Sequence, residues 1–120
     1  EVLVEGLLSL GLLNGSKEEN IEKGLYSKFY MHRIGHWMGM DVHDVGAYKK
    51  DGDWRELEKG MVMTIEPGIY ILDSLEDVDD KWKGIGVRIE DNIVINDSGN
   101  EFLTPDVPRT IEEVEQTVQG

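Results

Sequence analysis

The sequence has 120 residues, enough for one domain of ordinary size, and 39% of them are hydrophobic, so a packed core is expected. Its formal net charge of -13 argues against nucleic acid as a partner, because the phosphates would be repelled. The sequence has no cysteine, which excludes disulfides, thiolate metal sites and cysteine nucleophiles and fits a reducing compartment; we expect a cytoplasmic location. No apolar run approaches the ~20 residues that a membrane span needs, so no membrane association is expected.

Helices are predicted at both ends of the chain. Residues 1–13 have the apolar periodicity of an amphipathic helix and are followed by a glycine-containing turn. Ser16, with Glu19 three residues later, matches a capping box for a second short helix that runs to about Lys23. Residues 111–118 form a third helical segment. Because the chain starts with glutamate and no capping residue precedes its first helix, we expect it to be a piece of a longer protein.

The middle of the chain reads as strands joined by turns and polar loops. Four strands are predicted, over residues 61–66, 69–72, 86–95 and 101–103. Pro67-Gly68 imposes a bend after the first of them, and the turn-forming residues 97–100 favour a hairpin between the last two. The polar segment 49–60 and the acid-rich segment 73–84 are predicted to be exposed loops.

All three histidines of the chain lie within twelve residues, from His32 to His43, in the run HRIGHWMGMDVH. His32 and His36 are spaced i, i+4, but Arg33 stands where the zinc-protease motif HExxH has its general-base glutamate. The glycines of this run favour a turn-rich or partly extended segment over a helix. A single histidine is more often structural than functional, whereas three so close together favour metal ligation or proton transfer.

Two glutamates interrupt otherwise apolar strand patterns. The ordinary interpretation is that Glu66 and Glu90 point to solvent from an edge strand. However, Glu66 precedes the rigid Pro-Gly bend, and Arg88 falls on the same strand face as Glu90. A partly buried acid needs a metal ion or a cation as partner. Imidazoles together with carboxylates at strand ends are the components of a divalent-metal hydrolytic site, and such oxygen-rich ligands suit a hard ion such as Mn²⁺.

Three runs in this order carry a family resemblance: MHRIGHWMGMDVHDVGAY, LEKGMVMTIEPGIYI and GIGVRIEDNIVINDSGNEFLT. They resemble aminopeptidase P (Xaa-Pro aminopeptidase), which belongs with prolidase, methionine aminopeptidase and creatinase, most securely over residues 29–105. The resemblance implies an α+β fold, the C-terminal half of a pita-bread domain with a curved, mostly antiparallel sheet and flanking helices. Within this single catalytic-domain part, residues 1–25 would be a displaced helical piece, 26–110 the site-bearing sheet region, and 111–120 the terminal helix and tail.

The resemblance also implies a dinuclear site, usually with Mn²⁺, that removes an N-terminal residue preceding proline. Matched motif by motif, His36, Glu66 and Glu90 resemble metal ligands, with Glu66 also handling the proton of the metal-bound water. His32 and His43 resemble the histidines that hold the substrate and its tetrahedral intermediate. The expected partners are therefore peptides with proline at the second position.

Arg88 resembles a cation that orients the carboxylate ligands of this family, and it completes the set of catalytic residues that the motifs imply. The family site also needs two aspartates from upstream of the histidine motif, but residues 1–40 contain none. We therefore expect this chain by itself to hold at most one ion weakly, to lack peptidase activity, and to self-associate through the face that a missing half would cover. Two alternatives remain open: a Xaa-Pro dipeptidase (prolidase), and a non-catalytic pita-bread binding module.

Overall fold

The computed structural model describes all 120 residues, from Glu1 to Gly120. The chain divides into two compact units, each made of two separate stretches. The first unit contains residues 1–32 and 68–88, and the second contains residues 33–67 and 89–120. None of the helices has the length and apolar character that a membrane crossing requires.

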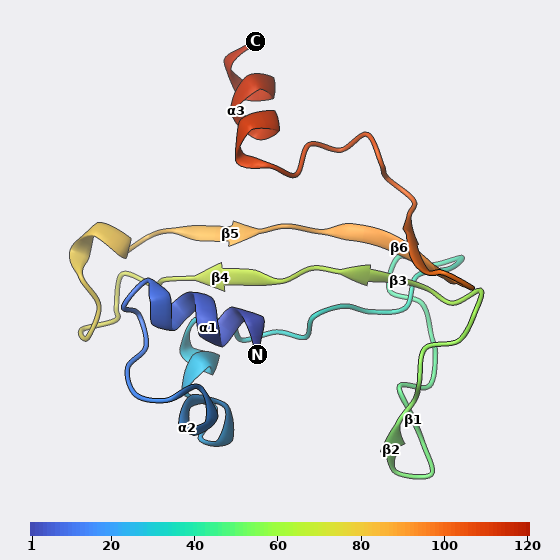
Figure 1. The fold of residues 1–120 in the computed structure, drawn as a ribbon, viewed down its shortest axis with the longest axis horizontal. Helices are drawn as coiled ribbons and strands as arrows, with labels where there is room; N and C mark the ends of the chain where they lie inside the picture. The colour runs from blue at the N-terminus through green and yellow to red at the C-terminus, as the bar shows by residue number, and fades with distance from the viewer. The chain divides into compact units, whose positions relative to one another are not determined.

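The first unit begins with helix α1 (Val2–Ser9; Figure 1). This helix buries Val4 and Leu7. The helix is shorter than the predicted 1–13, because Gly11 adopts a φ of 73° and turns the chain out of the helical path. The amide groups of Leu12 and Leu13 then both donate to the carbonyl of Leu7. This turn directs both leucines into the core, where they lie 6% and 5% exposed.

Helix α2 (Lys17–Glu22) begins where the sequence predicts. The Ser16 hydroxyl accepts a hydrogen bond from the Glu19 amide at 3.1 Å, which satisfies one of the free N–H groups of the first turn. Gly24, in the left-handed region at φ 63°, follows the helix and leads into a 3₁₀ turn, Leu25–Lys28. The capping residues therefore fix both limits of this helix.

The core of the first unit is one hydrophobic cluster that joins its two stretches of chain. Its buried members are Val4, Leu7, Leu12, Leu13, Phe29, Ile71 and Val78. Strands β4 (Gly68–Tyr70) and β5 (Gly86–Arg88) pair antiparallel beside one another (Figure 1). The segment between them, predicted to be an exposed loop, contains a 3₁₀ turn (Asp80–Trp82) and buries Val78, so the loop is anchored rather than free.

The second unit is built on a three-stranded antiparallel sheet in the order β3 (Val62–Ile65), β6 (Asp91–Asn96) and β7 (Gly99–Phe102). The two residues Asp97-Ser98 connect the last two strands as a tight turn, close to the predicted hairpin. Residues 34–38 pair along the free edge of β3 in extended form. The histidine segment is therefore partly extended and turn-rich, as predicted.

The prediction of a single strand over residues 86–95 is wrong. Strand β5 ends at Arg88 and pairs with β4, whereas β6 starts at Asp91 and pairs with β3. The break accompanies Pro67, which has no N–H to donate and accepts instead from the amide of Ile89 at 3.2 Å. Because the strand is interrupted, the predicted common face of Arg88 and Glu90 does not follow from strand alternation.

The segment predicted as a loop over residues 49–60 also contains secondary structure. Strands β1 (Lys49–Lys50) and β2 (Asp53–Trp54) form an exposed antiparallel hairpin. Asp51 and Gly52 connect them with positive φ values of 55° and 96°, the conformation of a type I′ turn. The hairpin is local, and all of its strand residues are exposed.

The C-terminal segment of the second unit is held by Arg109. Its Nε donates to the Asp91 carboxylate at 2.5 Å, and its two terminal nitrogens donate to the carbonyls of Thr104, Pro105 and Val107. One planar guanidinium thus satisfies four acceptors. Helix α3 (Ile111–Gln119) follows, close to the predicted 111–118.

Helix α3 starts at a complete capping box. The Thr110 hydroxyl accepts from the Glu113 amide, and the Glu113 carboxylate accepts from the amides of Arg109 and Thr110. The Arg109 amide is the main cause that lowers the pKa of Glu113 below its ordinary value, followed by the Thr110 amide.

Substitution of Arg109 by lysine is expected to destabilise the second unit by about 2 kcal/mol, because an ammonium group cannot reach all four acceptors and leaves the half-buried Asp91 poorly paired. Urea denaturation followed by circular dichroism would measure the loss. Arg55→Lys is the matched control, since Arg55 is exposed and its ion pair with Glu58 is long at 3.5 Å. Equal stability of the two variants would contradict the role of Arg109.

Candidate metal centre

Three of the residues singled out in the sequence come together in the second unit. His36, Glu66 and Glu90 each offer one ligand atom, and these atoms all lie within 4.8 Å of one another. The Nε2 atom of His36 is 3.3 Å from Oε1 of Glu66. His36 comes from the segment 34–38, Glu66 directly follows β3, and Glu90 directly precedes β6.

Strand register explains why these side chains converge. The ladder between β3 and β6 pairs Thr64 with Asn92 and Ile65 with Asp91, so its continuation sets Glu66 opposite Glu90. Residues directly opposite in an antiparallel pair share one face of the sheet. On the other edge of β3, the amide of Thr64 donates to the carbonyl of His36 and the amide of Glu66 to that of Ile34.

Gly35 permits this edge pairing because the backbones approach closely there. A Cβ atom at Gly35 would lie 2.0 Å from the carbonyl oxygen of Thr64 and 3.4 Å from the side chain of Met63. No side chain larger than hydrogen fits without moving the backbone. The close approach of the two backbones therefore requires glycine immediately before His36.

The orientation of the His36 ring is set by a backbone carbonyl. Its Nδ1 lies 3.0 Å from the oxygen of Trp37, and because that oxygen can only accept, Nδ1 carries the proton in this contact. The Nε2 atom of the ring then faces Oε1 of Glu66. A carbonyl-oriented imidazole is typical of metal-binding histidines.

The two carboxylates differ in their surroundings. Glu66 is only 8% exposed and accepts a hydrogen bond from the Thr64 hydroxyl at 2.9 Å, whereas Glu90 is exposed. A cation stabilises a buried carboxylate, and Glu66 is the more buried of the two. One oriented imidazole and two carboxylates are donors suited to a divalent ion, and the residues present therefore fit one.

His43 lies beside this group. Its ring centroid is 4.3 Å from that of His36, in an edge-on arrangement, and the residue is exposed. It therefore presents a second imidazole to solvent next to the three candidate ligands, as a substrate-facing histidine would require.

His32 and Arg88 belong to the first unit, where both lie against Tyr70. The Nε2 atom of His32 is 3.1 Å from the Tyr70 hydroxyl, and the guanidinium of Arg88 lies 5.8 Å above the Tyr70 ring. The ring of Tyr30 packs edge-on against His32 at 4.8 Å. Tyr70 was not among the residues singled out in the sequence, and its place two residues after the Pro-Gly bend was the one local signal for it.

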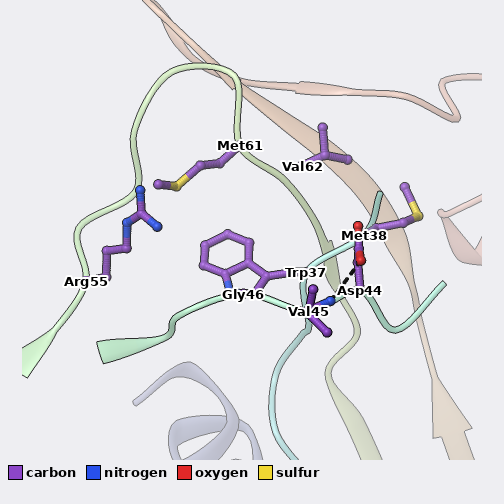
Figure 2. A pocket seen from close by; sticks show the side chains of 8 residues that line it. All are labelled: Trp37, Met38, Asp44, Val45, Gly46, Arg55, Met61 and Val62. Atoms are coloured by element: carbon purple, nitrogen blue, oxygen red, sulfur yellow. Dashed lines mark hydrogen bonds between the residues drawn. The ribbon is translucent and has the colours of Figure 1, made fainter. Parts of the chain in front are cut away.

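A separate hollow of about 230 Å³ lies near the histidine segment (Figure 2). It is lined by Trp37, Met38, Asp44, Val45, Gly46, Arg55, Met61 and Val62, which do not include any of the three candidate ligands. Gly46 lets the Trp37 ring approach, since a Cβ there would lie 2.4 Å from the indole. The indole also stacks on the Tyr48 ring, with 5.4 Å between the ring centroids, so Trp37 serves packing here.

Comparison with known proteins finds relatives that are metallopeptidases. The model of metallopeptidase family M24 matches residues 9–97. The Xaa-Pro aminopeptidase of Haemophilus influenzae is 51% identical over 114 residues, covering 95% of this chain and 26% of that protein. The human Xaa-Pro dipeptidase is 38% identical over 145 residues, covering 98% of this chain and 29% of that protein.

Among solved structures, the Pseudomonas aeruginosa aminopeptidase PepP superposes with a TM-score of 0.93 and 54% identity, over 97% of this chain and 26% of that one. The chain thus spans about a quarter of the length of the relatives it matches. The resemblance to aminopeptidase P and the α+β pita-bread fold that it implied are confirmed. By its matched family model and its relatives, the chain belongs to metallopeptidase family M24.

Proposed function

We propose that a longer polypeptide containing these residues is a metal-dependent exopeptidase that hydrolyses the bond between an N-terminal residue and proline. The observation that carries the proposal is the convergence of His36, Glu66 and Glu90 within 4.8 Å in a chain of this family. The aminopeptidase relatives at about half identity support the substrate class, and the lower identity of the dipeptidase favours it over prolidase.

In this proposal His36, Glu66 and Glu90 hold divalent metal, and Mn²⁺ is the ion that we propose. Bound metal would polarise the scissile carbonyl and make a water molecule more acidic. Glu66 suits a proton-accepting role as well, since it is a carboxylate whose Oε1 is already held by the Thr64 hydroxyl. Glu90, as the exposed ligand, would face the incoming substrate and solvent.

The remaining sequence-predicted residues are assigned to the substrate. His43, beside His36, is positioned to donate to an oxygen of the substrate that gains negative charge. His32, whose Nε2 lies 3.1 Å from the Tyr70 hydroxyl, is proposed to hold the substrate. Arg88 is proposed to orient carboxylates. Two aspartates from outside this chain would complete a dinuclear site, and we therefore predict that the chain alone binds at most one ion weakly. Self-association of the chain and a cytoplasmic location are two further predictions.

The test is hydrolysis by the complete polypeptide and by the 120-residue chain in parallel. The complete protein is expected to cleave a tripeptide with proline second, to lose this activity in EDTA, and to regain it with Mn²⁺, whereas the short chain shows none. Release of the first residue, followed by chromatography, is the measurement. Full activity in EDTA would contradict the metal-dependent mechanism, and cleavage by the short chain would contradict the need for outside ligands.

Substrate length separates the remaining alternatives. An aminopeptidase accepts the tripeptide, whereas a prolidase accepts only the Xaa-Pro dipeptide. A binding module cleaves neither and fails to bind Mn²⁺ through these residues. The retention of all three candidate ligands in one cluster is the observation against the binding module.

A further inference from the structure

We infer that Thr64 is a positioning residue that fixes His36 and Glu66 relative to each other before an ion binds. This inference rests on the proposed metal centre. Thr64 is not one of the three candidate ligands. Thr64 is the polar residue in the middle of β3, and it is 1% exposed. A hydroxyl buried this deeply is expected to have at least one hydrogen-bond partner.

Strand alternation sets Thr64 on the metal-facing side of the sheet. Thr64 lies on β3 and Glu66 directly follows the strand, two residues further on, so their side chains share one face. Thr64 is also the residue that pairs with His36 across the edge of the sheet, where its amide donates to the His36 carbonyl at 3.0 Å. One residue is thus adjacent to two candidate ligands from different segments of the chain.

The direction of each hydrogen bond follows from the groups involved. The amide of His36 can only donate, so at 3.0 Å the Thr64 oxygen accepts from it. The hydroxyl hydrogen is then available for Oε1 of Glu66 at 2.9 Å. The result is a one-way chain from the backbone of one ligand, through the threonine, to the carboxylate of the other.

The oxygen that receives this hydrogen bond is the same Oε1 that faces Nε2 of His36 at 3.3 Å. A donor on Oε1 restricts rotation of the carboxylate, and the bond to the His36 amide restricts the backbone from which the imidazole projects. The conformational entropy of ordering both ligands is therefore lost on folding rather than on metal binding, which favours affinity.

Thr64→Val in the complete polypeptide tests this role, because valine keeps the branched shape and removes only the hydroxyl. We expect Mn²⁺ affinity, measured by the electron paramagnetic resonance of free Mn²⁺, to fall about 10- to 100-fold, the range typical of residues that orient metal ligands. With Co²⁺ in place of Mn²⁺, the visible absorption spectrum is expected to shift in Thr64→Val. Thr64→Ser restores the hydroxyl and is expected to restore both properties.

A purely structural threonine would change the unfolding temperature of the metal-free protein and leave affinity and spectrum unchanged among the folded variants; that result overturns the inference. If Thr64→Val does not fold, Thr64→Ser still decides, since a folded serine variant with affinity reduced tenfold or more contradicts a hydroxyl-based role. Wild-type protein that binds no Mn²⁺ overturns the proposed function and this inference together. If the wild-type protein and Thr64→Val bind Mn²⁺ with equal affinity, this inference alone is overturned.

Discussion

Replacement of Gly35 by alanine is expected to destabilise the second unit by about 3 kcal/mol and to weaken metal binding at the same time. The added methyl group would lie 2.0 Å from the carbonyl oxygen of Thr64, which belongs to the backbone and cannot rotate away. The edge pairing of residues 34–38 with β3 must then open, and His36 moves with it. Urea denaturation and Mn²⁺ titration of the same preparation measure the two effects.

Gly6→Ala is the matched control for this substitution. Gly6 lies inside helix α1, and a Cβ atom there would have no atom within 4 Å beyond its chain neighbours and the backbone of its own helix. The control is expected to be neutral or to stabilise by up to about 1 kcal/mol, because alanine favours the helix more than glycine does. If Gly35→Ala behaves like Gly6→Ala, the close approach at Gly35 is not a determinant of the site.

Substitution of Glu66 by glutamine is expected to reduce the peptidase activity of the complete polypeptide about a thousandfold. Metal ions contribute several kcal/mol to such hydrolyses, which corresponds to rate factors of this size, and a neutral amide replaces a charged ligand. Glutamine keeps the shape of the side chain and an oxygen that accepts from Thr64, so the fold should persist. Initial rates on a Xaa-Pro tripeptide, with bound metal measured by atomic absorption, are the readouts.

Glu101→Gln is the control for loss of one negative charge. Glu101 lies on β7 in the same unit and is exposed. It is expected to retain full activity and full metal content. Retention of both by Glu66→Gln would exclude Glu66 as a ligand, whereas loss of activity with full metal content would assign it to proton transfer alone.

Much of the fold followed from local sequence signals. Helix α2 began at the predicted cap, because Ser16 needs only a partner three residues away. The missed hairpin had a local signal too: Asp51-Gly52 is a strong turn pair, but the charged composition around it favoured a loop. The break between β5 and β6 was not predictable, since it depends on which distant strand each segment pairs with.

The candidate ligands came from motif resemblance, and the structure explains what the motifs encode. His36 and Glu66 are thirty residues apart, so their proximity depends on edge pairing that no local pattern reveals. Thr64 escaped notice for the same reason: its hydroxyl becomes meaningful only when His36 is placed beside β3. Alternation placed Thr64 and Glu66 on one face from the outset, and a polar residue two positions before a candidate ligand was the available signal.

The strand register has a consequence for how such a chain can change in length. The exposed β1–β2 hairpin carries none of the three candidate ligands, so residues added at its tip cost only a little loop-closure entropy. One residue inserted between Thr64 and Glu66 would instead turn the carboxylate to the opposite face of the sheet. Insertions and deletions should therefore accumulate at the hairpin and be excluded from β3, because the length of β3 sets the positions of the candidate ligands.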